Sequence, residues 1–241
     1  MPTKTLARRT TPVRPVAAAI PPLRDGERLS RAEFLRRWEA MPELKRAERL
    51  EGVVRVMASP VDVRGHAAED HAFAWCLRYY AMGTPGTLSF GNGTTHVDSD
   101  NDCQPDQALI VLPDFGGQTR WSGRRIAGAP ELVGEVAHTS ASRDLRVKKE
   151  VFRRNGVLEY LVWQTKAQKL DAFRLDDGQY VHETPADGVW KSVAFPGLWL
   201  NFAALLADDP PAIEATSQAG RASPEHAAFV KQLALRRHHT T

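Results

Sequence analysis

One stretch of the chain, residues 130–163, constrains the fold more than any other. Its sequence predicts an apolar strand, a polar loop, an amphipathic helix that ends at Asn155-Gly156, and a second apolar strand. Two charged residues interrupt this apolar pattern. Glu135 falls within the first strand, and Lys148 falls on the apolar stripe that Leu145 and Phe152 define on the helix. A charge at such a place is costly unless it is paired or holds a ligand, so the same stretch is the first candidate for chemistry.

The elements around this stretch indicate an α+β domain, with a mixed β-sheet flanked by helices. We expect residues 1–27, rich in Arg and Pro, to form a disordered arm. The domain itself is expected at residues 28–206, followed by a linker and a C-terminal helix within residues 207–241. The expected helices lie at about 30–41, 66–82, 201–207 and 223–235. The expected strands lie at about 50–58, 87–90, 94–97, 104–112, 170–175 and 179–181, the last two joined by a hairpin turn at Asp177-Gly178.

Composition excludes some classes of protein. Hydrophobic residues make up 42% of the 241 residues, which is a globular composition, and the net charge of +3 allows nucleic-acid binding only through a local patch. Two cysteines are too few for a disulfide framework or a four-cysteine zinc site. No apolar run approaches the roughly 18 residues that span a bilayer. We therefore expect a cytoplasmic protein with no membrane partner.

Two carboxylates and a lysine form the candidate site. Strand alternation places Asp106 on one face with Ala108 and Ile110, and Glu135 on a face of the later strand. Two carboxylates that converge at a sheet edge suit a hard cation such as Mg²⁺. With the ammonium of Lys148 beside it, and Asp144 one turn earlier to orient that lysine, such a site suits phosphodiester hydrolysis. A structural network, with Asp106 as a turn acid and Lys148 paired to Glu135, explains the periodicity equally well.

The same residues lie within motifs that, in combination, resemble the Uma-two family of restriction endonucleases, part of the PD-(D/E)XK nuclease superfamily. The resemblance covers roughly residues 29–206. Its motifs are Pro105-Asp106, Glu135-Val136-Ala137, Asp144 to Lys148 with Phe152, residues 155–160, residues 50–53, residues 58–60 and residues 195–200.

The resemblance implies a restriction-endonuclease-like core in which Asp106 and Glu135 bind Mg²⁺, with Mn²⁺ as a substitute and the Val136 carbonyl as a further ligand. The superfamily lysine stands two residues after the glutamate, where this chain has Ala137, and in this family it is relocated to the next helix, at Lys148. Glu48 matches a glutamate that often supports the metal site.

The expected activity is that of an endonuclease with Asp106, Glu135 and Lys148 as catalytic residues, acting on double-stranded DNA and working as a homodimer. Two alternatives stay open. One is a catalytically weak or inactive nucleic-acid-binding accessory protein of the same fold, and the other is a partner protein that uses the C-terminal helix. Two departures bear on activity, because His138-Thr139 and Gln164 stand where many relatives have Ser-Pro and Asp.

Other polar residues have both a functional and a structural interpretation. His138 is close enough in sequence to Glu135 for a proton relay, but also suits a loop. His66 suits either a phosphate contact or a helix start. Asp98, Asp100 and Asp102 suit a second cation site or a solvated turn. The arginines of residues 120–125, with Trp121 among them, suit a DNA-backbone contact or an exposed loop.

Overall fold

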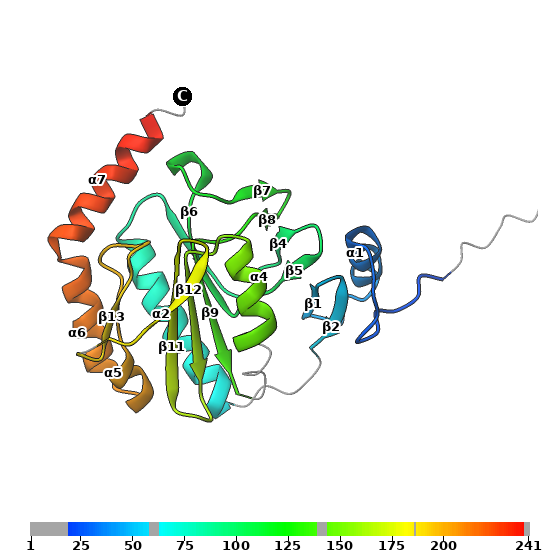
Figure 1. Ribbon diagram of the computed structural model, residues 1–241, viewed down its shortest axis with the longest axis horizontal. Helices are drawn as coiled ribbons and strands as arrows, with labels where there is room; N and C mark the ends of the chain where they lie inside the picture. Colours follow the sequence, from blue (N-terminus) through cyan, green and yellow to red (C-terminus); the bar gives the residue numbers. More distant parts are fainter. Residues whose placement is uncertain (1–18, 58–62, 139–143, 186, 239–241) are drawn as a thin grey trace, which may run out of the picture.

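The computed structural model describes residues 19–57, 63–138, 144–185 and 187–238. Within these ranges, most strands belong to two mixed six-stranded sheets (Figure 1). The N-terminal sheet contains β1 (Ala47–Leu50), β2 (Val53–Val56), β4 (Thr95–Asp98), β5 (Asn101–Cys103), β7 (Arg120–Ser122) and β8 (Arg125–Ala127), in the order β2-β1-β5-β4-β8-β7. The central sheet contains β3 (Thr87–Phe90), β6 (Gln107–Val111), β9 (Leu132–Ala137), β10 (Glu159–Gln164), β11 (Lys169–Asp176) and β12 (Gln179–Glu183), in the order β12-β11-β10-β9-β6-β3.

Helices flank both sheets. They are α1 (Arg31–Glu39), α2 (Ala68–Met82), α4 (Lys149–Arg154), α5 (Phe202–Ala207), α6 (Pro210–Arg221) and α7 (Pro224–His238), with short helical turns η1 (Val63–Ala67), η2 (Pro113–Phe115) and η3 (Asp144–Lys148). A small sheet of β13 (Val189–Lys191) and β14 (Trp199–Asn201) lies near α5 and α6. This confirms the expected α+β class and mixed sheet, although there are two such sheets where one was expected.

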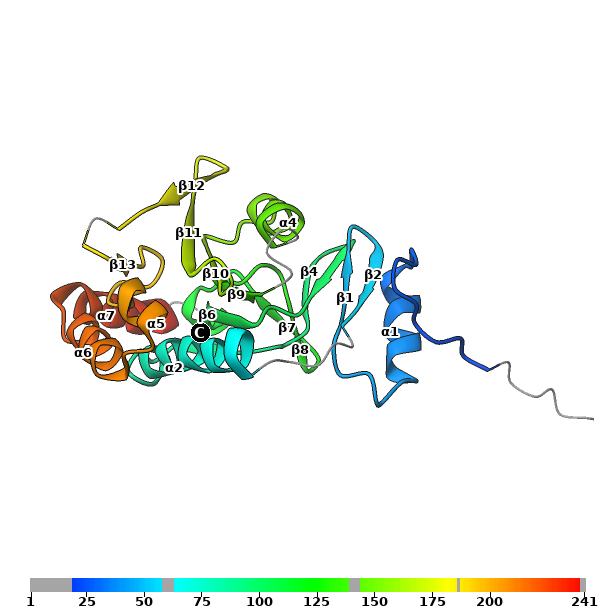
Figure 2. The same cartoon turned by 90° about the horizontal axis from the view of Figure 1, so that it is seen from below.

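The central sheet is covered on both faces, by α2 on one and by α4 on the other (Figure 2). Phe73 of α2 packs in a core cluster with Leu132 of β9, whereas Phe152 of α4 packs with Val133, the next residue of that strand. Gly134 allows the close approach of α2, because a Cβ there would lie 2.2 Å from the Phe73 ring. Residues of β9 are therefore buried whichever way they point, and Glu135 is one of them.

The first hairpin corrects the expected strand at residues 50–58. β1 and β2 pair antiparallel from Leu50 opposite Val53, so Glu51 and Gly52 form a two-residue turn. Their φ angles of 54° and 74° are both positive, as a type I′ hairpin turn requires. The hairpin places β1, which carries Glu48, next to β5 in the N-terminal sheet.

The prediction that residues 1–27 form a disordered arm is wrong for the last part of that range. Residues 1–18 lie outside the described residues, but Leu23 is buried with Phe34 and Val54 in a small core. The backbone of Gly26 donates a hydrogen bond to the Val54 carbonyl at 2.9 Å. The end of the arm therefore packs on the β1–β2 hairpin, because Leu23 supplies apolar surface to it.

The expected linker after residue 206 is also wrong, because residues 210–221 form α6. Asp209 caps this helix by accepting a hydrogen bond from the Ala212 backbone. Ile213 of α6 and Phe229 of α7 belong to the same core cluster as α2, so both helices pack on the body. Figure 1 shows them along the side of the molecule opposite α1. No helix in the described parts of the chain has the length and apolar character needed to cross a membrane.

Candidate functional site

The two predicted carboxylates meet because β6 and β9 are neighbouring antiparallel strands. Gln107 lies opposite Gly134, so Asp106, just before β6, lies at the level of Glu135. Asp106 Oδ2 accepts a hydrogen bond of 2.9 Å from the Val136 backbone. Asp106 and Glu135 are only 3% and 2% exposed. The two acids therefore lie at neighbouring positions of adjacent strands, and both are buried.

Lys148, at the end of η3, reaches the same place. Its Nζ lies 2.9 Å from Glu135 Oε1 and 3.0 Å from Glu48 Oε1, and the residue is 3% exposed. The inward placement that helical spacing predicted for Lys148 is therefore confirmed. The lysine joins three elements at one point, since Glu48 comes from β1, Glu135 from β9 and Lys148 from η3.

Glu48, which we expected only to support the metal site, is itself held within the cluster by polar contacts. Its side chain is fully buried. Oε1 also accepts a hydrogen bond of 2.8 Å from the Gln104 backbone. Oε2 is buried and has no hydrogen-bond partner among the described residues. A buried carboxylate oxygen left in this way is costly unless a ligand completes its coordination.

Arg46 completes the cluster, and the sequence analysis missed it. Its Nη2 lies 2.8 Å from Asp106 Oδ1, with the arginine side chain 26% exposed. The residue stands just before β1, where no apolar periodicity marks it. Glu48 follows two residues later on the hairpin, and residues two apart in a strand point to the same face. This spacing is the sequence signal that could have placed Arg46 beside Glu48.

His66 lies at the start of the α2 region, as expected of a helix-start histidine, but its ring turns toward the site. Nε2 is 3.7 Å from Asp106 Oδ2, and Nδ1 is buried without a hydrogen-bond partner among the described residues. Four residues later, Asp70 Oδ1 accepts a hydrogen bond of 2.8 Å from Gln107. The amino-terminal end of α2 therefore forms one wall of the site.

The pKa values of two acids at the site, Asp106 and Asp70, shift in opposite directions. Burial tends to raise the pKa of Asp106, but the charges of Lys148 and Arg46 and the Val136 hydrogen bond outweigh it and lower the pKa. Burial raises the pKa of Asp70, a shift that the nearby charge of Asp106 reinforces and the Gln107 hydrogen bond opposes. Asp106 is therefore kept ionised, while Asp70 holds a proton more readily.

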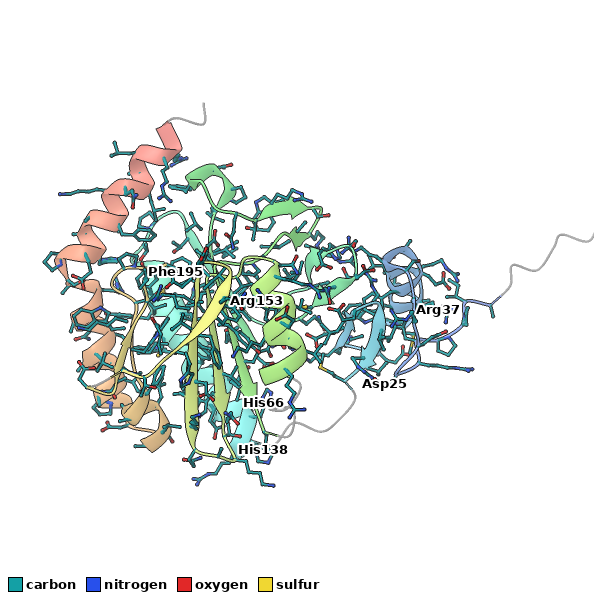
Figure 3. The ribbon with its side chains drawn as sticks, in the orientation of Figure 1. Asp25, Arg37, His66, His138, Arg153 and Phe195 are labelled. Atoms are coloured by element: carbon teal, nitrogen blue, oxygen red, sulfur yellow. The ribbon has the colours of Figure 1, made fainter. Side chains whose placement is uncertain are left out.

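Of the two remaining supporting candidates, the structure describes the side chain of only one, His138. His138 Nδ1 lies 3.0 Å from Thr165 Oγ1, a residue outside the cluster. Figure 3 labels His138 and His66 near the same end of the central sheet. Asp144 begins η3, but its side chain lies outside the described part of the chain, so its proposed contact with Lys148 stays a prediction.

The acidic run at residues 98–102 is mainly structural. Asp102 is fully buried and accepts hydrogen bonds from Arg49 at 2.8 Å and Arg31 at 2.7 Å. Asp98 accepts hydrogen bonds from Asn101 and Asn155. The run is therefore neither a cation site nor, at Asp102, a solvated turn.

The described part of the chain contains no group of three or more His, Cys, Asp or Glu side chains arranged to hold a metal ion. The chemistry of the cluster nevertheless fits a hard cation. Asp106, Glu135 and Glu48 supply carboxylate oxygens, the donors that Mg²⁺ prefers, and Glu48 Oε2 still lacks a partner among the described residues. Lys148 and Arg46 neutralise the cluster in their present positions.

The fold thus combines two mixed sheets, helices on both faces of the central sheet, and a buried cluster in which carboxylates meet a lysine. A family model matches residues 31–203, and the chain belongs to that family, Uma2, described as "Putative restriction endonuclease".

A solved structure agrees with this fold. It is described as a "putative nuclease belonging to DUF820" from Anabaena variabilis ATCC 29413, and it aligns with a TM-score of 0.54 at 15% sequence identity. The alignment covers 72% of this chain and 97% of that chain. No curated protein matches the chain.

Proposed function

We propose that this protein is a magnesium-dependent endonuclease that hydrolyses phosphodiester bonds of double-stranded DNA. Asp106 and Glu135 would hold the ion, with Glu48 beside them, and Lys148 would be the catalytic cation. The observation that carries the proposal is the burial of Lys148 between Glu135 and Glu48, within a cluster that also includes Asp106. A lysine at the centre of several carboxylates combines the charges that phosphodiester hydrolysis needs.

The chain's own residues have separable tasks. A bound Mg²⁺ would supply charge neutralisation at the scissile phosphate and acidify a water molecule. Asp106 stays ionised at neutral pH because Lys148 and Arg46 lower its pKa. Lys148 Nζ, which has three donors, orients the attacking water or stabilises the charge that develops on the phosphate. The near-complete burial of these side chains limits competing hydration.

Cleavage of supercoiled plasmid tests the proposal. The wild-type protein should convert the plasmid to nicked and linear forms in Mg²⁺ or Mn²⁺ and not in EDTA. Asp106→Asn should lower the rate by about 10²-fold or more, as loss of one transition-state interaction does. Asp176→Asn is the matched control, because the Asp176 carboxylate is 60% exposed. Equal cleavage with and without EDTA would contradict the metal requirement, and equal rates in wild type and Asp106→Asn would contradict the site.

The accessory-protein alternative has one observation in its favour. Arg46 and Lys148 already pair with Asp106 and Glu135, as in a structural salt-bridge network. Calorimetric titration with Mn²⁺ separates the two proposals. No heat of binding in the wild type would support the accessory role, whereas saturable binding that Asp106→Asn weakens would support the nuclease.

A further inference from the structure

Arg46 occupies the position at Asp106 where a cation would bind. Its Nη2 lies 2.8 Å from Asp106 Oδ1, and its charge also acts on Glu135 and Glu48. The three carboxylates and the two cations Arg46 and Lys148 have a formal net charge of −1. A divalent ion would therefore have to enter a cluster that is already largely neutralised, and the positive charge of Arg46 would oppose its entry.

The cluster holds both an unmatched acceptor and unmatched donor capacity. Glu48 Oε2 and Arg46 Nε are both buried without hydrogen-bond partners among the described residues. An acceptor of this kind needs a cation or a proton donor, and the guanidinium edge needs an anionic oxygen. A divalent cation together with a phosphate group satisfies both at once.

Arg46 lies closer to solvent than Lys148 does, although its Nε is buried. The Arg46 side chain is 26% exposed, whereas Lys148 and the three carboxylates are nearly or fully buried. Guanidinium groups bind phosphate through two parallel hydrogen bonds, and Nε with Nη2 forms one such edge. Nη2 now contacts Asp106, so the same edge becomes available to phosphate once Asp106 takes another cation.

We infer that Arg46 exchanges partners: it neutralises Asp106 before the cation binds, and moves to the scissile phosphate when the cation arrives. This inference rests on the proposed function. It adds that Arg46 becomes available to the DNA phosphate only when the cation binds. The exchange couples metal and phosphate binding, since each favours the arrangement that the other needs.

Metal titration without DNA tests the first half of the exchange. Arg46→Gln removes the charge that competes for Asp106, so the protein should bind Mn²⁺ about tenfold more tightly than the wild type. Arg46→Lys keeps the charge and should stay within about threefold. Arg37→Gln is the matched control, because Arg37 pairs with Glu27 and Glu33, and it should leave the affinity unchanged.

DNA cleavage at saturating metal tests the second half. Arg46→Gln should cleave about 10²-fold more slowly than the wild type, although it binds metal more tightly, and Arg46→Lys should be intermediate. A merely structural arginine would not produce tighter metal binding together with slower cleavage. Unchanged or weaker metal binding by Arg46→Gln would overturn the inference, as would cleavage by Arg46→Gln at the full rate of an active wild type.

A measurement on the wild-type protein makes the test independent of variant folding. In an NMR titration with Mg²⁺ and no DNA, the Arg46 side-chain Nε–H signal should shift with the metal-binding curve, while that of Arg37 stays in place. Metal binding with a stationary Arg46 signal would overturn the exchange, and so would a complete absence of metal binding. Because this titration needs no turnover, a protein that binds metal but cleaves nothing contradicts the proposed nuclease without contradicting the exchange.

Discussion

Replacing Lys148 by methionine is expected to destabilise the fold strongly. Methionine keeps most of the side-chain stem, but it removes the ammonium that lies 2.9 Å from Glu135 and 3.0 Å from Glu48. Both carboxylates are essentially buried, with side chains 3% and 0% exposed. Removing one member of a buried ion pair typically costs about 3–5 kcal/mol, because the remaining charge is left unpaired in a medium of low polarity.

Urea denaturation in EDTA measures this cost. Wild type, Lys148→Met and Lys231→Met should be compared at neutral pH, with equal m-values as the check that all unfold in the same way. Lys231 is exposed on α7, so its replacement should change the free energy of unfolding by less than about 0.5 kcal/mol. A loss below about 1 kcal/mol in Lys148→Met would refute the claim that this lysine neutralises buried carboxylates.

The same variant should respond to metal more than the wild type does. Without the ammonium of the lysine, the carboxylates are less neutralised and should bind a cation more tightly. An ion at about 100 times its dissociation constant adds about 2.7 kcal/mol to the free energy of unfolding. Mg²⁺ should therefore restore a large part of the loss in Lys148→Met. Identical unfolding curves with Mg²⁺ and with EDTA would show that the carboxylates are not metal ligands.

Three further predictions concern other parts of the molecule. Burial raises the pKa of Glu159 to about 7 from an ordinary 4.5, so its contribution to stability is full below pH 4.5 and is lost as the pH rises through 7. Urea denaturation at pH 5 and pH 8 measures this pH dependence of the unfolding free energy, and Glu159→Gln should remove up to about 3 kcal/mol of it. Leu233→Ala should cost about 2–5 kcal/mol, because Leu233 is fully buried, while Leu235→Ala, at an exposed position, should cost little. Arg120→Ala with Arg124→Ala should reduce the slope of log affinity against log salt for DNA by about 0.9 for each phosphate that the protein no longer neutralises.

Each of these has a clear contrary result. An unchanged pH dependence in Glu159→Gln would place the titration elsewhere. Equal losses in the two leucine variants would mean that α7 does not pack as described. An unchanged salt slope would exclude the exposed β7–β8 hairpin from the DNA contact.

The sequence predicted the centre of the site because its signal is periodic. Glu135 interrupts an apolar strand and Lys148 an apolar helical stripe, and burial then made pairing necessary. Asp106 was found by strand alternation, and the register of β6 and β9 explains why it meets Glu135. These are local patterns that a single chain displays.

The rest of the site depends on contacts between distant segments, which local patterns do not display. Arg46 precedes its strand and is partly exposed, so neither period nor hydropathy distinguishes it from a surface arginine. Asp102 follows two other acids in a polar run, and only the fold brings Arg31 and Arg49 to it. The turn at Glu51-Gly52 was missed because apolar residues on both sides suggested one continuous strand.

The most direct test of the central claim is the rate of plasmid cleavage in Mg²⁺ by Lys148→Ala, measured beside wild type and the exposed control Lys231→Ala. Ala137 stands at the position of the superfamily lysine. If Lys148 takes over the role of that lysine, its loss should slow cleavage by about 10²–10³-fold, while the control should cleave as the wild type does. Equal rates in all three proteins would contradict the assignment of Lys148 and with it the proposed mechanism.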